Sequence, residues 1–304
     1  MTTKVAVIGE CMLELSQVSG FAGECSRPMK MSYGGDTLNT CVYLSRGNIS
    51  TTYITALGDD VNSEWLINEW QSEKIDCSLI ERMADSVPGM YMIDIDEHGE
   101  RAFSYWRKDS PASRLFDQEE KVAELFSKLN DFSHVYLSGI SLAILPADSL
   151  LRLFGYLEQY RSQGGKIIFD GNYRPKLWQS IDMAQHAYLK MYQITDIALP
   201  TLEDEELLFG YSTGEQLIEV IRDLGVSEIV VKMGGDGCLA YCDQATEYVA
   251  ANPTVPVDTT AAGDSFNAGY LSARLQGCDL RESCTAGHQL ASKVIQHRGA
   301  IIPV

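Results

Sequence analysis

Basic residues are scarce in this chain of 304 amino acids. Lys and Arg together number 24 against 42 Asp and Glu, so the formal net charge is −18. A surface with this excess of negative charge repels nucleic acid and anionic lipid, and we expect neither as a partner. An anionic small molecule would have to be bound by a local group of positive side chains.

Long apolar runs and cysteine clusters are also missing. No stretch approaches the roughly 20 apolar residues that a helix needs to span a bilayer. The short apolar run at 5–8 has no small-residue cleavage site behind it and predicts a strand rather than a signal peptide. The eight cysteines and five histidines show neither a Cys-x-x-Cys pair nor zinc-like spacing. We therefore expect a cytoplasmic protein with reduced thiols and no membrane partner.

Short β-branched runs alternate with segments of helical spacing. Apolar stripes such as Leu150, Leu153 and Leu157 predict helices between the runs. This alternation is typical of a mainly parallel sheet covered by helices on both faces, so we predict a three-layer α/β/α fold. The predicted strands lie at 5–8, 52–55, 135–137, 166–169, 197–199 and 228–232.

Two stretches interrupt this rhythm. Residues 13–33 are polar and contain glycine, and residues 89–107 alternate around an Asp96-Glu-His-Gly99 turn, as in an antiparallel hairpin. An inserted hairpin can serve as a flap or a dimer surface, or it can merely extend a sheet. We predict one domain spanning 1–304, with a small β-sheet lid formed by about 13–33 and 89–107. A homodimer through that lid is the expected assembly.

The segment 257–270 carries the clearest chemistry. Apolar residues fall at helical intervals after Gly263, so the small residues before it lie at a helix start. Their backbone N–H groups can approach an anion at the positive end of the helix dipole. We predict an anion hole at Ala261, Ala262 and Gly263, with the Asp264 carboxylate beside it.

An anion hole next to a carboxylate suits phosphoryl transfer. The amides would stabilise charge on the γ-phosphoryl oxygens while Asp264 accepts the proton of the attacking hydroxyl. The helix dipole and a nearby metal should keep Asp264 ionised. From the pattern alone, an N-cap aspartate with small neighbours for packing is an equal alternative.

Motifs at both ends of the chain resemble the ribokinase-like (PfkB) carbohydrate kinases. Asp258-Thr-Thr-Ala-Ala-Gly-Asp264 is similar to the family signature Asp-Thr-x-Gly-Ala-Gly-Asp. Gly34-Gly-Asp-Thr-Leu-Asn39 is similar to its Gly-Gly pair with a following Asn, and the first strand ends in a similar acidic segment, 7–14. The resemblance covers residues 4–303 and implies a ribokinase-like fold that uses ATP and Mg²⁺.

The resemblance also implies roles for single residues. Asp264 would be the general base and would contact the sugar together with Gly34, Gly35 and Asn39. His288 stands where many relatives carry an Asn beside the adenine, although a surface histidine is an equal alternative. The ATP site would comprise Asn172, Lys232, Gly234, Gly235, Gly237, Ala261, Gly263 and His288.

Two metal sites are implied in the same way. Asp258 and Thr260 align with positions that bind a monovalent cation, with K⁺ as the candidate, although Asp258 could instead cap its turn. Relatives organise Mg²⁺ with Asn-x-x-Glu, where this chain has Thr201-Leu-Glu-Asp204-Glu205. Asp204, or Glu205 in the other register, would hold Mg²⁺ through water.

Further segments, among them Tyr105-Trp-Arg107, resemble family members that act on 2-keto-3-deoxygluconate (2-dehydro-3-deoxy-D-gluconate). The resemblance implies that Tyr91, Tyr105, Arg107 and Arg174 surround this sugar acid, which would be phosphorylated at its 6-position. A guanidinium fork matches a carboxylate bidentately, and an acidic chain needs such a local positive partner. Alternatively, Arg107 is a surface residue and Arg174 a structural ion-pair partner.

Other functions fit part of the sequence. A different sugar kinase, of the fructokinase or ribokinase type, is the nearest alternative. A Rossmann dehydrogenase is disfavoured because Gly9-Glu-Cys-Met lacks the Gly-x-Gly-x-x-Gly that follows the first strand in that fold. An inactive sugar-sensing relative is disfavoured because Asp264 and its small neighbours are intact.

Overall fold

A computed structural model of the chain describes residues 3–17, 27–95 and 101–304. Within these ranges, the largest sheet has eight strands in the order β14-β13-β12-β11-β10-β9-β1-β4. Neighbours from β12 to β4 run parallel, while β13 and β14 are antiparallel at one edge. All six predicted strands are confirmed in it. Their bounds are β1 Lys4–Ile8, β4 Ser50–Ile54, β9 His134–Ser138, β10 Lys166–Asp170, β11 Ile197–Leu199, β12 Glu228–Lys232, β13 Cys238–Cys242 and β14 Ala245–Val249.

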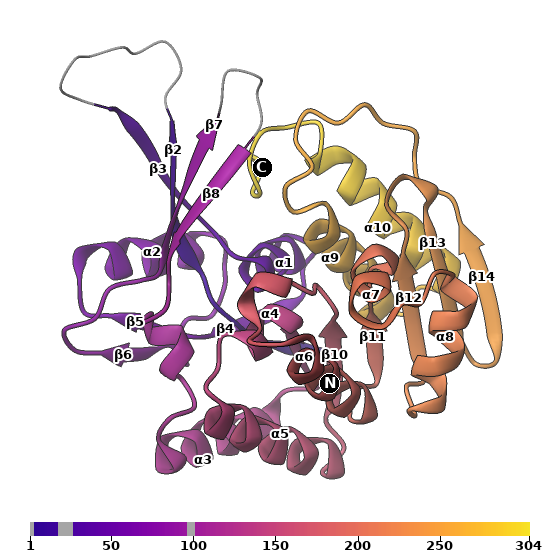
Figure 1. Cartoon of the computed structure of the whole chain (residues 1–304), viewed down its shortest axis with the longest axis horizontal. Coiled ribbons are helices and arrows are strands. Elements are labelled where there is room, and N and C mark those ends of the chain that lie inside the picture. The colour runs from indigo at the N-terminus through magenta and orange to yellow at the C-terminus, as the bar shows by residue number, and fades with distance from the viewer. Residues whose placement is uncertain (1–2, 18–26, 96–100) are drawn as a thin grey trace.

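Helices cover both faces of this sheet, which confirms the three-layer architecture (Figure 1). Successive strand residues point to opposite faces, so in β10 Ile167 and Phe169 join one core while Ile168 joins the other. The first core is closed by α3 (Glu119–Lys128), α4 (Gly139–Ala143), α5 (Ala147–Ser162), α6 (Ile181–Gln193), α7 (Leu202–Phe209) and α8 (Gly214–Asp223). The second is closed by α1 (Asp36–Arg46), α2 (Val61–Ser72), α9 (Ala262–Leu275) and α10 (Leu280–Val294).

A second, separate sheet projects from this body (Figure 1, upper left). Its strands lie in the order β3 (Met29–Gly34), β2 (Met12–Gln17), β7 (Met90–Ile95) and β8 (Arg101–Trp106), and we call it sheet B. β7 and β8 pair antiparallel, as predicted. The predicted turn at 96–99, and residues 18–26 of the other predicted lid segment, lie outside the described residues. A short pair, β5 (Ala56–Gly58) and β6 (Glu81–Met83), stands beside the main sheet.

The two faces of sheet B differ in chemistry. Glu14 lies opposite both Ser32 and Tyr91 in the register, and Tyr91 lies opposite Tyr105, so these polar and aromatic side chains share one face. The other face carries Leu15, Met31, Met92 and Trp106, of which Met31 is 44% and Trp106 54% exposed.

The seven cysteines in the described ranges are free thiols, and Cys25 lies outside these ranges. No helix in them is long and apolar enough to cross a bilayer.

Candidate active site

A cavity of about 870 Å³ opens at the carboxyl ends of the parallel strands. It begins where β10 ends at Asp170 and β12 ends at Lys232, and α7 and the start of α9 complete its wall. In open α/β sheets, ligands bind outside the carboxyl ends of the strands. Every residue predicted to hold ATP lines this cavity: Asn172, Lys232, Gly234, Gly235, Gly237, Ala261, Gly263 and His288.

The start of α9 faces into the cavity. The helix begins at Ala262, and the preceding Ala261 has a left-handed backbone with φ of 59°. The Ala262 amide donates to the Thr259 carbonyl oxygen at 3.2 Å, so one predicted donor of the anion hole belongs to this turn. A Cβ on Gly263 would lie 3.8 Å from the Lys232 Nζ, so the glycine brings the helix start close to that cation.

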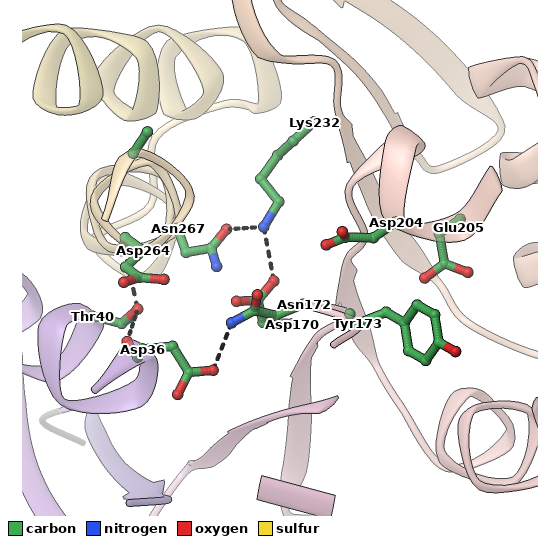
Figure 2. Close-up of polar contacts among 12 residues, drawn as sticks. Asp36, Thr40, Asp170, Asn172, Tyr173, Asp204, Glu205, Lys232, Asp264 and Asn267 are labelled. Atoms are coloured by element: carbon green, nitrogen blue, oxygen red, sulfur yellow. Dashed lines mark hydrogen bonds and ion pairs between the residues drawn. The ribbon is translucent and has the colours of Figure 1, made fainter. Parts of the chain in front are cut away.

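Asp264 lies where α9 meets α1. Its Oδ2 accepts a hydrogen bond of 2.8 Å from Asn39 Nδ2. The Thr40 hydroxyl donates to its carbonyl oxygen at 3.2 Å (Figure 2). Burial, and next the nearby Asp36 carboxylate, raise the pKa of Asp264 to about 8. Burial thus opposes the ionisation that the helix dipole and a nearby metal are predicted to favour.

A buried ion pair between Lys232 and Asp170 lies near Asp264, and the Asp36 carboxylate is held beside it by Asn172. Lys232 Nζ donates to Asp170 at 2.8 Å and to Asn267 Oδ1 at 3.1 Å, and Asn172 Nδ2 donates to Asp36 at 2.7 Å (Figure 2). Lys232 and Asp170 are 7% and 1% exposed, so water screens their charges little. The sequence interpretation missed Asp36, Asp170 and Asn267. The available signal was that Asp36 follows the glycine pair and that Asp170 ends a buried strand.

The two acidic residues offered for Mg²⁺ point in different directions. Asp204 lines the cavity and points toward Asp170 and Lys232, whereas Glu205 is fully buried and accepts from the Tyr192 hydroxyl (Figure 2). Burial raises the pKa of Glu205 to about 8. Only Asp204 of this pair can face a ligand in the cavity.

The positions of His288 and Asp258 bear on two alternatives left open by the sequence, a surface histidine and a turn-capping aspartate. His288 is 6% exposed and lies 4.9 Å from the Phe266 ring, so the interpretation as a surface histidine is wrong. Asp258 Oδ1 accepts from the Thr260 amide at 2.9 Å and from its hydroxyl at 2.6 Å, so Asp258 does cap its turn. The described residues contain no cluster of three or more His, Cys, Asp or Glu side chains that could hold a metal ion.

Three of the residues predicted to bind the sugar belong to sheet B: Gly34 in β3, Tyr91 in β7 and Tyr105 in β8. At Gly35 the backbone passes close to Glu10: a Cβ there would lie 2.2 Å from the Glu10 carbonyl oxygen, so only glycine fits. A Cβ on the neighbouring Gly34 would lie 2.9 Å from the Tyr91 hydroxyl. Tyr91 donates to Glu14 and packs on Tyr105 with ring centroids 5.9 Å apart.

The two arginines are placed differently. The Arg107 side chain is only 13% exposed and forms an ion pair with Glu10, so the interpretation of Arg107 as a surface residue is wrong. The Arg174 side chain is 51% exposed, lines the cavity and lies 3.4 Å from Asp204. The structure therefore does not bring the two guanidinium groups together on one shared acidic partner.

Comparison with known proteins identifies the family. The model of the pfkB family carbohydrate kinases matches residues 2–304. The chain belongs to this family. A 2-dehydro-3-deoxygluconokinase of Escherichia coli K12 is 45% identical over 313 residues, covering 100% of this chain and 98% of the relative. That of Dickeya dadantii is 44% identical, with the same coverage.

A solved structure agrees with the fold. The 2-dehydro-3-deoxygluconokinase of Thermotoga maritima matches with a TM-score of 0.87 at 19% identity, covering 99% of this chain and 96% of that one. The predicted ribokinase-like fold is thus confirmed. Family and relatives together make this PfkB kinase a phosphotransferase that acts on an alcohol group.

Proposed function

We propose that this PfkB kinase transfers the γ-phosphoryl group of ATP to the 6-hydroxyl of 2-dehydro-3-deoxy-D-gluconate. The observation that carries the proposal is the position of Asp264. It lines the cavity at the strand ends and accepts a hydrogen bond from Asn39 in α1, the helix that directly follows strand β3 of sheet B. The full-length similarity to 2-dehydro-3-deoxygluconokinases supports this choice of substrate.

ATP would occupy the cavity with its base toward His288 and its phosphates toward the start of α9. The Gly263 amide belongs to the first turn of α9, where backbone N–H groups lack acceptors within the helix. Lys232, close to Gly263, adds a positive charge for the transferring group. Mg²⁺ would neutralise phosphate charge, with Asp204 holding it through water, since carboxylate oxygens suit a hard cation.

Asp264 would act as the general base. Its carboxylate takes the proton from the 6-hydroxyl, the hydroxyl oxygen bonds to the γ-phosphorus, and the bond to the β-phosphate oxygen breaks to release ADP. Because the pKa of Asp264 is raised to about 8, its carboxylate is a stronger base than that of an ordinary aspartate.

The sugar acid would lie against Gly34, Gly35, Asn39, Tyr91 and Tyr105. Arg107 and Arg174 would supply donors to its oxygens, with a guanidinium matching the carboxylate. Sheet B, with the segments 13–33 and 89–107, would be a lid that excludes water from the phosphoryl group. The oxygens of Asp258 and Thr260 are suited to a monovalent cation such as K⁺.

The apolar face of sheet B would join two copies of the chain. Met31 and Trp106 are exposed on it, and exposed large apolar side chains that lie together mark interaction surfaces. A homodimer through this face would leave the polar face of each lid turned toward its own active site.

A substrate panel tests the proposed function. The unmodified enzyme should release ADP with 2-dehydro-3-deoxygluconate and far less with fructose or ribose, because a site built for a charged group rejects its neutral analogue. Asp264→Asn should lower kcat at least ~100-fold while ATP still binds, as expected on loss of a positioned base. In the unmodified enzyme kcat/KM should rise with pH as Asp264, whose pKa is raised to about 8, loses its proton, and this rise should disappear in the Asn variant. Robust turnover of fructose, or an Asn variant with more than about a tenth of the activity, would contradict the proposal.

A further inference from the structure

A buried carboxylate that the proposed reaction does not use lies beside the proposed sugar site. Glu10 follows β1, and its side chain is 1% exposed. One carboxylate oxygen, Oε2, accepts from the Arg107 guanidinium, and the other, Oε1, accepts from the Ser110 hydroxyl. A charge this deeply buried is costly unless it is paired and fully bonded, and both oxygens of Glu10 have a partner.

Glu10 stands at the junction of the three parts that would form the sugar site. Its own carbonyl oxygen faces Gly35, where a Cβ would approach to 2.2 Å. A Cβ on Gly89, before β7, would lie 3.0 Å from Glu10 Oε1 and 3.4 Å from the Arg107 Cβ. Glycines therefore allow the main sheet, the start of α1 and sheet B to close around this carboxylate.

The Arg107 guanidinium still has an unused donor. Its NH2 group bonds to Glu10, but among the described residues its buried Nε–H has no hydrogen-bond partner. Buried donors of native proteins are nearly always satisfied, so an unsatisfied one is expected to meet a ligand or water. A guanidinium can bind an acid with one edge and present its other N–H groups elsewhere because its five donors form a rigid fork.

We propose that Glu10 is a positioning residue that, with Ser110, holds Arg107 so that the remaining guanidinium donors meet the oxygens of the sugar acid. This inference rests on the proposed function. Burial raises the pKa of Glu10 and the Arg107 charge opposes that rise, in line with two charges that depend on each other. Glu10 touches no reacting atom and acts through Arg107.

The alternative is that the pair only fastens sheet B to the body. The two roles differ in kinetics. A fastening role would change stability, or the KM for both substrates, whereas a positioning role changes the KM for the sugar acid and leaves the KM for ATP within about twofold.

The test is a double-mutant cycle on the full chain. Glu10→Gln keeps an acceptor but removes the charge, and it should raise the KM for 2-dehydro-3-deoxygluconate about 10-fold, as for a lost charge-assisted bond. In an Arg107→Ala background the same change should have no further effect on KM. It should also recover thermal stability there, because Arg107→Ala alone leaves Glu10 buried and unpaired.

A milder variant guards against misfolding. Ser110→Ala removes one of the two bonds to Glu10 and should raise the same KM about threefold, since a neutral bond contributes less than a charged one. An unchanged sugar KM in Glu10→Gln or Ser110→Ala would overturn the inference, as would equal losses in both backgrounds of the cycle.

Failure of the proposed function has a different signature. If the unmodified enzyme phosphorylates only neutral sugars, the substrate assignment is overturned. The same cycle, run with whichever sugar is turned over, still decides whether Glu10 acts through Arg107.

Discussion

At the scale of single residues, Ala261 adopts a backbone conformation that its side chain disfavours. Its φ of 59° lies in the left-handed region, where the family signature carries glycine. The left-handed conformation costs a non-glycine residue about 1 kcal/mol or slightly more. The strain lies directly before the helix start that would bind phosphate.

Ala261→Gly should therefore raise the free energy of unfolding by about 1 kcal/mol without loss of activity. Urea unfolding of both proteins measures the difference. Ala262→Gly is the matched control: this residue is helical, so glycine there should lower stability by up to ~1 kcal/mol. Destabilisation by both changes would mean that the backbone at residue 261 relaxes in solution.

Arg174 is the more accessible of the two arginines. Half of its side chain is exposed, and its contact with Asp204 is long, at 3.4 Å. Such a pair contributes little to stability, so its charge remains available to a substrate. Arg107, by contrast, is paired with the buried Glu10, and its Nε–H has no partner among the described residues.

Arg174→Ala should lower kcat/KM for the sugar acid roughly 10- to 150-fold more than for a neutral ketose, as for loss of a charge-assisted hydrogen bond. Steady-state kinetics with both sugars measures the difference. Arg174→Lys should give a selective loss of kcat/KM between those of the unmodified enzyme and Arg174→Ala. The lysine ammonium group keeps the positive charge but not the forked donor geometry of the guanidinium. Equal losses for both sugars would assign Arg174 to the phosphates or to the fold.

At the scale of elements, sheet B is joined to the body at its base, where Leu13 and Tyr33 pack on the second core. Its polar face carries Tyr91 and Tyr105, and Tyr105 is 53% exposed. Described contacts between this sheet and the body include the Arg107–Glu10 ion pair at its base. An element attached near one end can move as a unit when a ligand fills the space beneath it.

Substrate binding should protect the amides of β7 and β8 from hydrogen exchange. Closure of sheet B over the sugar would remove these strands from water and reduce local opening. Exchange is followed by mass spectrometry with the sugar acid and a non-hydrolysable ATP analogue. Strands β13 and β14, at the far edge of the main sheet, serve as the internal reference. No added protection between residues 91 and 107 would count against a lid.

At the scale of the whole molecule, the apolar face of sheet B predicts the assembly. Trp106→Glu places a charge on that face and should convert a dimer into monomers. Sedimentation velocity distinguishes the two states. Tyr248→Glu is the control, since Tyr248 is a similarly exposed aromatic residue, 53% exposed, on β14. A mass unaffected by either change would place the interface elsewhere.

Patterns among neighbouring residues in the sequence determined most of the secondary structure of the main sheet and its helices. Six of the eight strands of the main sheet, all but β13 and β14, follow from short β-branched runs, and the helices between them follow from apolar spacing. Both patterns are properties of neighbouring residues. The start of α9 is likewise local, since Ala261 to Asp264 are consecutive. For that reason Asp264 and the small residues before it could be singled out from the sequence.

The tertiary structure alone decided which side chains meet. Glu10 and Arg107 are 97 residues apart, and Asp170 and Lys232 are 62 apart. Their contacts depend on strand order and on how sheet B folds back, which no local pattern encodes. Asp204 and Glu205 differ by one position on α7, yet the rotation of that helix turns one to the cavity and the other to the core. Burial also raises the pKa of Asp264, because the cost of ionisation depends on the surroundings and not on the residue type alone.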